Sequence, residues 1–309
     1  MKNRYRDYNS YLKDIYGQRV QKISLDAGLG CPNRDGGISS KGCIYCDPRG
    51  SGTGAKTLRD ISIKEQLEAG IEWAKKRYGA EKYIAYFQSY TNTYAPVEIL
   101  KELYDQPLSY EGMVGLSIGT RPDCIDRGKL ELLNSYTDKY LVWIEYGLQS
   151  AHDTTLAAIN RGHDVKAFID AVNMTAEYGI NICAHVILGL PGETGDMMME
   201  TAQFLADQPI NGVKIHSLYV TKGTQLAKMY RNKEVTCMER DEYIETLIDF
   251  LELLPPEYII QRVTGDPNRD DLIAPAWTLE KTNNLNLFKK RLEERDTWQG
   301  WRYNESGGK

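Results

Sequence analysis

The sequence predicts an α/β fold: a partial TIM-type barrel of six strand–helix units, with a short N-terminal segment and a C-terminal extension. Between residues 20 and about 221, short runs rich in β-branched and aromatic residues alternate with longer stretches of helical apolar spacing. Such alternation is typical of a parallel sheet whose strands are joined by helical crossovers. Six units are fewer than the eight that close a full barrel, so we expect the barrel to be open.

Each predicted element rests on its own apolar pattern. Strands are expected over residues 20–25, 82–87, 113–118, 140–148, 182–190 and 212–220. Helices are expected around 63–74, over 97–104 and 127–135, around 168–175 and over 193–206. Beyond residue 221 the alternation ends, and we expect a helix over 240–254, a further strand over 258–263 and an exposed helix over 278–295. The chain therefore divides into an N-terminal segment (1–19), a barrel (20–221) and an extension packed on it (222–309).

Length and cysteine content constrain the class of protein. A chain of 309 residues can bury a large core without disulfide bonds, and its length allows either two domains or one α/β barrel. No apolar run approaches the roughly 18 residues that span a bilayer, and the N-terminus lacks the apolar stretch of a secretory signal. We therefore expect a cytoplasmic protein with no membrane partner, whose cysteines are metal ligands or free thiols.

The charges are distributed unevenly along the chain. Residues 1–60 carry eleven Lys or Arg and six Asp, a net charge of +5, whereas the whole chain carries −5. Tyr5, Tyr8, Tyr11 and Tyr16 lie among the first of these cations. Because cations follow a phosphate backbone and aromatic rings stack on bases, the pattern is suggestive of RNA binding. The alternative is that the tyrosines pack the segment on the barrel and the cations form a solvated surface.

Three of the six cysteines lie in the loop after the first predicted strand, as Cys31-x11-Cys43-x2-Cys46. An odd number of cysteines in a reducing compartment disfavours a disulfide, and a structural zinc ion would need a fourth ligand that is not nearby. An iron–sulfur cluster held by three thiolates leaves one iron open to substrate. A metal with a distant fourth ligand and three chance thiols are the alternatives. No second cluster is expected from the cysteines that lack paired spacing: Cys124, Cys183 and Cys237.

The segment Gly42-Cys43-Ile44-Tyr45-Cys46 resembles the signature of radical S-adenosylmethionine (SAM) enzymes. The usual spacing there is Cys-x3-Cys-x2-Cys, and the longer first gap is similar to the subgroup that contains the catalytic subunit of Elongator. Further segments similar to that subgroup follow in order: Thr120-Arg121-Pro122-Asp123, Glu145-Tyr146-Gly147-Leu148-Gln149-Ser150, Asn160-Arg161-Gly162-His163, Leu190-Pro191-Gly192, Lys214-Ile215-His216 and Ile260-Gln261-Arg262. The resemblance implies a radical SAM barrel with a [4Fe–4S] cluster on Cys31, Cys43 and Cys46. The open iron would bind SAM, whose reductive cleavage yields a 5′-deoxyadenosyl radical.

The resemblance also implies residues that bind SAM. Tyr45 lies in the cluster loop, and Gln88 and Ser89 end the second strand, where relatives contact the methionine amino group. Gln149 matches a ribose-binding amide, and Arg161 matches an arginine that pairs with the SAM carboxylate. Alternatively, Gln88, Ser89 and Gln149 are ordinary polar residues at strand ends. Arg161 would then lie on the surface of a helix.

Five further polar residues are candidates for the cavity of the barrel. Glu145 faces either the interior, where a carboxylate needs partners, or a neighbouring element. His185 is expected near the SAM ribose, or else is a hydrogen-bonded core histidine. Lys214 and His216 lie two positions apart on the last strand, so both are expected to face the cavity, with Lys214 binding a substrate anion or pairing with an acidic loop. Arg262 is expected to reach a phosphate or carboxylate, or to form a surface salt bridge.

The resemblance is strongest to short, stand-alone radical SAM proteins of the YhcC/YtqA type. The full Elongator subunit has a downstream acetyltransferase domain, for which the roughly 45 residues after Arg262 are too few. We therefore expect a radical SAM enzyme that processes the carboxymethylaminomethyl group on C5 of a tRNA wobble uridine toward aminomethyl. An external electron donor such as flavodoxin or ferredoxin is implied. The alternatives are a radical SAM enzyme acting on a small metabolite and a non-catalytic, metal-binding RNA-binding module.

Overall fold

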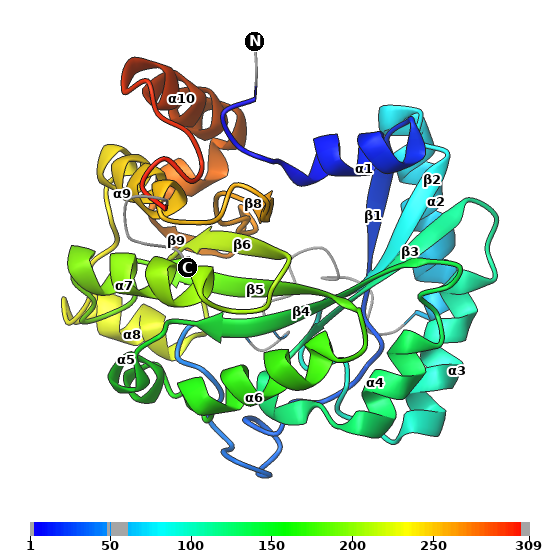
Figure 1. Cartoon of the computed structure of the whole chain (residues 1–309). Coiled ribbons are helices and arrows are strands. Elements are labelled where there is room, and N and C mark those ends of the chain that lie inside the picture. The colour runs from blue at the N-terminus through cyan, green and yellow to red at the C-terminus, as the bar shows by residue number, and fades with distance from the viewer. Residues whose placement is uncertain (1–2, 48–49, 51–60, 304–309) are drawn as a thin grey trace.

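Seven parallel strands form a curled sheet at the centre of the molecule, and most of the helices lie around its outer face (Figure 1). The computed structural model describes residues 3–47, 50 and 61–303, so part of the long loop after the first strand lies outside the described residues. The strand order is β1-β2-β3-β4-β5-β6-β8, and every neighbouring pair is parallel. This arrangement confirms the predicted α/β partial barrel.

The elements follow the predicted alternation of strands and helices. The strands of the sheet are β1 (Val20–Leu25), β2 (Lys82–Phe87), β3 (Met113–Thr120), β4 (Leu141–Gln149), β5 (Asn181–Leu188), β6 (Gly212–Ser217) and β8 (Ile259–Arg262). The helices that follow the strands are α2 (Ile63–Tyr78), α3 (Val97–Leu108), α4 (Arg127–Asn134), α5 (Asp153–Ala158), α6 (Val165–Ala176), α7 (Gly195–Ala206), α8 (Gln225–Arg231) and α9 (Arg240–Glu252). The other elements are α1 (Tyr8–Tyr16), η2 (Pro122–Cys124), β7 (Val220–Thr221), β9 (Leu272–Ala274), η3 (Ala276–Leu279) and α10 (Lys281–Glu294).

The sheet has one strand more than the six that the alternation predicts. Strand β8, from the predicted extension, pairs with β6, so that Gly212 lies beside Ile259 and Lys214 beside Arg262. Helix α9 precedes β8 and packs on α7, and the segment therefore adds a seventh strand–helix repeat whose longer connection hides it in the sequence. The predicted strand 212–220 is also divided: β6 ends at Ser217, and β7 pairs with β9 in a separate antiparallel sheet.

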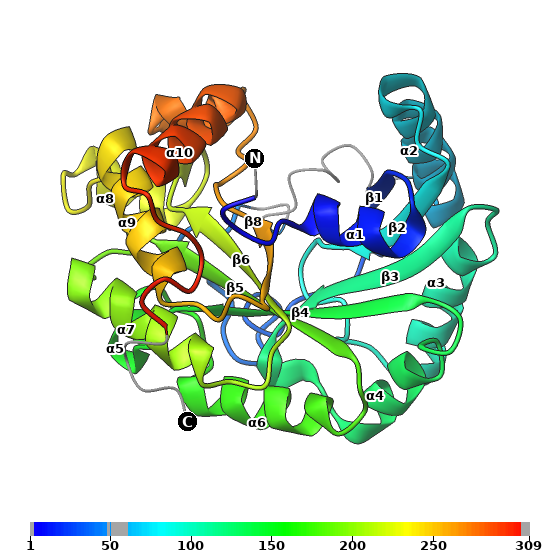
Figure 2. The ribbon, with the colours of Figure 1, turned by 45° about the horizontal axis from the view of Figure 1, so that its top comes forward.

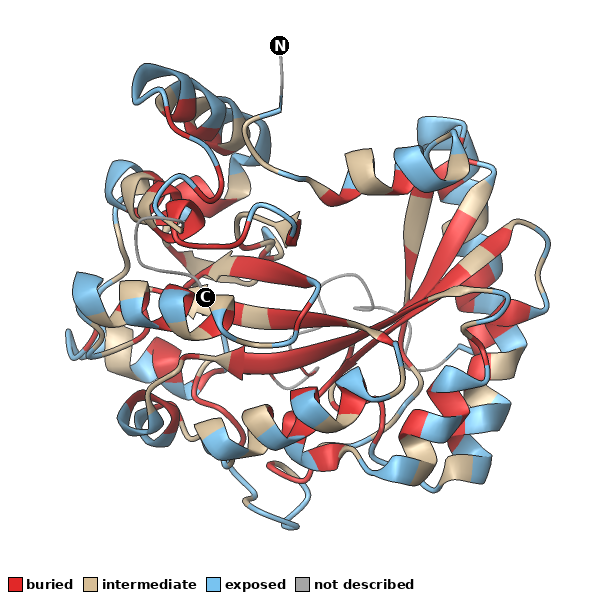
Figure 3. Cartoon of the chain, in the orientation of Figure 1, coloured by how far each residue is buried: buried red, intermediate tan, exposed pale blue. Residues whose placement is uncertain are grey.

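Burial explains why these residues form strands and helices. The central strands are buried along nearly their whole length, because the helices cover one face of the sheet and the barrel interior lies against the other (Figure 3). Helix α2 shows the local determinants clearly. Ser62 and Glu65 form a capping box at its start, and Gly79, with φ +62°, ends it in the left-handed region. Its buried face includes Leu67 and Ala74.

The N-terminal segment spans the open side of the barrel, between β1 and β8 (Figure 2). The Ile260 N–H donates to the Arg6 carbonyl at 2.9 Å. Tyr8 and Tyr11 set their rings edge-on against Trp143 of β4, with centroids 5.9 and 6.1 Å away. The remaining tyrosines also face the protein: Tyr5 packs on Phe288, and the Tyr16 hydroxyl donates to the Val114 carbonyl. These four rings therefore pack the N-terminal segment on the barrel, as the alternative prediction stated, and are not presented for stacking on bases.

Because all seven strands run in one direction, their carboxyl ends and the loops after them meet at one end of the barrel. The described helices include none that combines the length and the apolar character needed to cross a bilayer. The polar side chains that the sequence singled out lie inside the barrel and toward the carboxyl ends of the strands.

Candidate active site

A cavity of about 190 Å³ opens at the carboxyl ends of the strands. It brings together residues from the loop after β1 and from β2, β4, β5, β6 and β8. The predicted site residues that line it are Cys31, Cys43, Tyr45, Cys46, Gln88, Glu145, Gln149, Arg161, His185, Lys214, His216 and Arg262. Ser89 is the exception: it is buried outside the cavity lining, with no hydrogen-bond partner for its hydroxyl among the described residues.

The position of Ser89 has a local cause in the backbone. The chain turns after β2 at Tyr90, whose φ is +59°. This turn places Gln88, Tyr90 and Thr91 on the cavity wall and leaves Ser89 in the core. The Ser89 side chain therefore does not line the cavity in this structure, whereas Gln88 does.

The cysteine loop is held against the segment that follows α5. The Ile44 N–H donates to the Ile159 carbonyl at 3.0 Å, and the Asn160 side chain donates to the Gly42 carbonyl at 2.6 Å. In return, the Asn33 side chain donates to the Asn160 carbonyl at 2.7 Å. These contacts explain why the Asn160-Arg161 pair, more than 100 residues from the cysteines, lies beside them.

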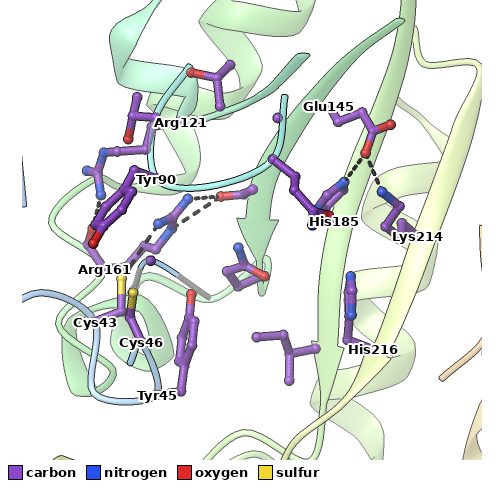
Figure 4. Close-up of a pocket in the computed structure, with 18 of the residues that line it drawn as sticks. Cys43, Tyr45, Cys46, Tyr90, Arg121, Glu145, Arg161, His185, Lys214 and His216 are labelled. Carbon is purple, nitrogen blue, oxygen red and sulfur yellow. Dashed lines mark hydrogen bonds and ion pairs between the residues drawn. The ribbon is translucent and has the colours of Figure 1, made fainter. Parts of the chain in front are cut away.

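Cationic and amide N–H groups point at two of the thiols. Figure 4 shows one of them, Arg161, beside Cys43. Arg34 Nη1 lies 3.3 Å from Cys46 Sγ, and Arg161 Nη1 lies 3.6 Å from Cys43 Sγ. Asn33 Nδ2 is also 3.6 Å from Cys43 Sγ. Burial alone would raise the pKa of Cys43, but the Arg161 guanidinium holds that pKa below the ordinary thiol value. The environment therefore favours thiolate, the form that binds metal.

The donor set fits an iron–sulfur cluster better than a single metal ion. Across residues 3–47, 50 and 61–303, no three His, Cys, Asp or Glu side chains are close enough together to hold one ion. Cys31, Cys43 and Cys46 nevertheless line the same cavity, as thiolates at separate corners of a cluster would. N–H groups directed at the sulfurs are the contacts that orient such ligands and tune the cluster.

Gly147 allows Arg161 and Gln149 to meet beside the thiols. Arg161 donates from Nε and Nη2 to the Gly147 carbonyl, at 3.2 and 2.6 Å. A Cβ on Gly147 would lie 2.5 Å from Arg161 Nη2 and 2.7 Å from Gln149 Nε2, so a larger residue would displace the ends of both side chains. The register of β4 on β5 shifts at this point, and Gln149 adopts a φ of +81°. This irregular strand end presents Gln149 to the cavity.

Glu145 is the centre of an ion-pair network on the other side of the cavity (Figure 4). Its side chain is fully buried, and its Oε1 accepts from Lys22 Nζ at 2.6 Å. Its Oε2 accepts from His185 Nε2 at 2.8 Å and from Lys214. Lys214 also donates to the Tyr86 hydroxyl at 2.9 Å. Of the two predicted orientations, Glu145 therefore takes the interior one, and its partners come from three other strands.

Burial and neighbouring charges set the protonation states in this network. Burial would raise the pKa of Glu145, but Lys214 and Lys22 hold it well below its usual value. Burial lowers the pKa of Lys214 to about 8, and burial with the Lys214 charge lowers the pKa of His185 to about 4. At neutral pH, Glu145 is therefore charged, Lys214 is mainly an ammonium, and the neutral His185 ring donates from Nε2.

Several cavity residues were missed by the sequence interpretation. Arg121 is 2% exposed, pairs with both oxygens of Asp123 and donates to the Arg161 carbonyl at 2.8 Å. It belongs to one of the motifs that carried the family resemblance, so its role could have been suspected. Lys22 is harder to predict from the sequence, because nothing about a lysine in the first strand indicates that its ammonium group points into the barrel. The other missed residues are Arg34, Tyr86, Tyr90 and Tyr219.

Comparison with known proteins identifies the family of this chain. A family model of the radical SAM superfamily matches residues 28–205, and a model of the radical SAM C-terminal domain matches residues 210–294. The protein YtqA of Bacillus subtilis (strain 168) is 40% identical over 297 residues, which cover 96% of this chain and 92% of YtqA. A tRNA uridine(34) acetyltransferase of Dehalococcoides mccartyi is 27% identical over 156 residues, which cover 50% of this chain and 33% of that protein.

Among solved structures, the archaeal Elp3 of Methanocaldococcus infernus has a similar fold, with a TM-score of 0.63 at 20% identity. The match covers 94% of this chain and 68% of that chain. The superfamily model spans more than half of this chain, including the three-cysteine loop and strands β2 to β5. The chain therefore belongs to the radical SAM superfamily, whose enzymes use a [4Fe–4S] cluster and SAM.

Proposed function

We propose that this radical SAM enzyme acts on tRNA and modifies the C5 side chain of the wobble uridine, converting a carboxymethylaminomethyl group to aminomethyl. The observation that carries the proposal is the cavity itself, where a three-thiol loop faces a cationic recess suited to an anionic substrate. The similarity to a protein that acts on uridine 34 of tRNA supports the choice of substrate.

The cofactor half of the cavity is assigned to one group of residues. Cys31, Cys43 and Cys46 would hold the cluster, Arg161 the carboxylate of SAM and Gln149 its ribose. When bound, the cluster and SAM would supply a 5′-deoxyadenosyl radical to abstract a hydrogen atom from the carbon between the amine and the carboxylate of the substrate. Loss of a second electron to the cluster and attack of water on the resulting imine would break the C–N bond, which leaves aminomethyl uridine and releases the two-carbon unit as glyoxylate. SAM is the two-electron oxidant in this balance, and it leaves as methionine and 5′-deoxyadenosine. Tyr45 and Gln88 line the same half and would position SAM against the loop.

The other half of the cavity would hold the substrate. Glu145 keeps Lys214 and His185 in place through short, buried contacts, so these side chains do not need to reorganise when substrate binds. We assign His185 to contact with the SAM ribose, and Lys214, His216 and Arg262 to contact with the uridine side chain.

An external one-electron donor such as flavodoxin or ferredoxin would supply the reducing electron. All six cysteines are free, which supports work in the reducing cytoplasm.

The proposal is tested by comparing the modified nucleosides of tRNA from wild-type cells and from cells that lack the gene. We expect carboxymethylaminomethyl uridine to accumulate and aminomethyl uridine to fall in the deletion strain. A strain that carries Cys43→Ala should show the same profile, whereas Cys237→Ala should restore the wild-type profile, because Cys237 lies outside the cavity lining. Unchanged profiles in the deletion strain would contradict the tRNA substrate.

A further inference from the structure

Four polar residues form a recess on the side of the cavity opposite the thiols. We call Lys214, His216, Tyr219 and Arg262 the β6–β8 recess, since they come from these two strands and the turn after β6. Figure 4 shows Lys214 and His216 on the side of Glu145, across the cavity from Cys43 and Cys46. The His216 ring lies 5.6 Å from the ring of His185, so the recess borders the region assigned to SAM on the side away from the thiols.

Two cations of the recess lie on neighbouring strands at the same level. Lys214 of β6 and Arg262 of β8 are register partners, and both line the cavity. His216 lies two residues beyond Lys214 along β6, on the same side of the sheet. The strand pairing holds the backbone positions that carry these two cations side by side.

The nearby carboxylates do not neutralise these cations. Both oxygens of Glu145 are occupied: one by Lys22 and the other by Lys214 and His185. Within the described chain, the one ion pair of Arg262 is a 4.0 Å approach to Asp266. The other oxygen of Asp266 lies 2.5 Å from Lys281. Glu145 is thus shared by Lys22 and Lys214, and Asp266 by Arg262 and Lys281. The excess positive charge is stabilised when an anion enters.

Two neutral donors complete the recess. In the described residues, neither the His216 ring nor the Tyr219 hydroxyl has a hydrogen-bond partner. Burial, followed by the charge of Arg262, keeps the pKa of His216 well below its usual value, so its ring is neutral and retains one N–H. Burial raises the pKa of Tyr219 to about 12, so its hydroxyl is also a donor at neutral pH.

We propose that the β6–β8 recess binds a carboxylate on the side chain of the substrate base, and that Arg262 is the residue that selects for it. This inference rests on the proposed function, in which the substrate is a modified uridine. The planar guanidinium of Arg262 matches the two oxygens of a carboxylate, and the donors of His216 and Tyr219 are available to it. Backbone phosphates of an RNA are less suitable occupants, because the recess lies inside the cavity beside the fully buried Glu145.

Two small probes test the recess without requiring RNA: 5-carboxymethyluridine and its amide, 5-carbamoylmethyluridine. They have nearly the same shape and differ in charge. Binding is measured anaerobically by ligand-observed NMR on the cluster-loaded protein with SAM present. We expect the wild type to prefer the carboxylate by about tenfold or more, as for a charged hydrogen bond in a partly buried site. Arg262→Gln should remove the preference, and Arg262→Lys should keep part of it.

Controls separate the recess from the cofactor site and from general charge effects. Arg269→Gln removes an exposed cation of the same C-terminal segment and should leave the preference unchanged. SAM affinity should be unchanged in Arg262→Gln and weakened in Arg161→Gln. The proposal is overturned if the wild type binds neither probe or both equally, if Arg262→Gln keeps the preference, or if Arg262→Gln loses SAM binding.

The test also distinguishes the recess from the tRNA substrate. One outcome is a carboxylate preference that depends on Arg262 while the tRNA nucleosides of the deletion strain are unchanged. This outcome would support carboxylate binding by the recess and reject tRNA as the substrate. Altered tRNA nucleosides without any carboxylate preference would retain tRNA and reject the recess. Iron content and the circular dichroism spectrum of each variant show whether it has folded and loaded its cluster.

Discussion

Replacing Glu145 with glutamine removes the charge that holds two buried lysines in the barrel. Glu145 is fully buried, and its carboxylate accepts from Lys22, Lys214 and His185. Glutamine has nearly the same shape and leaves the packing unchanged. The substitution therefore isolates the electrostatic contribution of the network.

The expected loss of stability follows from the burial of the partners. Leaving a buried charge without its partner costs about 3–5 kcal/mol. Lys22 is 18% exposed and can move toward solvent, whereas Lys214 is only 4% exposed, so most of the loss comes from Lys214. The amide oxygen still accepts one hydrogen bond, and we therefore expect the lower end of that range, about 3 kcal/mol. For a chain of this length, such a loss lowers Tm by about 5 °C.

Thermal unfolding of the cluster-free protein at pH 7, followed by circular dichroism, measures the loss. The double variant Glu145→Gln/Lys214→Met should recover most of it, because the buried ammonium is removed as well. Asp170→Asn is the matched control: its ion pair with Lys166 is exposed and should contribute about 0.5 kcal/mol or less. A single variant as stable as the wild type, or a double variant no better than the single, would refute the reasoning.

Three further predictions follow from the site. Alanine at Cys31, Cys43 or Cys46 should abolish the iron-dependent absorbance. Alanine at Cys124 or Cys183 should leave that absorbance in place. Full absorbance in any of the first three variants would contradict the ligand assignment. Gly147→Ala should weaken SAM binding at least about tenfold while iron content is retained. The reason is that the new methyl group overlaps the Arg161 guanidinium and the Gln149 amide. Equal SAM affinity of the variant and the wild type by calorimetry would argue against both contacts. His185→Gln should flatten the acid dependence of stability. The buried ring keeps a pKa of about 4 whereas unfolded histidine titrates near 6.5, so the unfolded state binds an extra proton as pH falls and the wild type loses stability. From pH 7 to 5 we expect the wild type to lose about 2 kcal/mol more than the variant in urea unfolding, and parallel losses would show that the ring titrates normally.

The central strands and their helices could be predicted because their patterns are local. A strand buried on both faces is an apolar run, and a helix packed on a sheet repeats its apolar residues every three or four positions. Strand β8 was expected as an element but not as part of the barrel, because sheet membership depends on which strand it pairs with. The position of Ser89 has a related cause: the backbone turn at Tyr90 decides which side chains of that segment face the cavity.

By itself, the sequence determined the reactive groups of this protein: three thiols in one loop, followed in order by the amide, arginine, histidine and lysine positions of a radical SAM barrel. Tertiary structure alone decided how those groups are paired. Lys22 meets Glu145 across 123 positions, and Arg161 meets Cys43 across 118. Tertiary structure also packs Tyr8 and Tyr11 against Trp143 and places Arg262 beside Lys214. Sequence periodicity reports only which face of an element is buried, whereas these pairings depend on the curl of the sheet, which brings distant strands to one cavity.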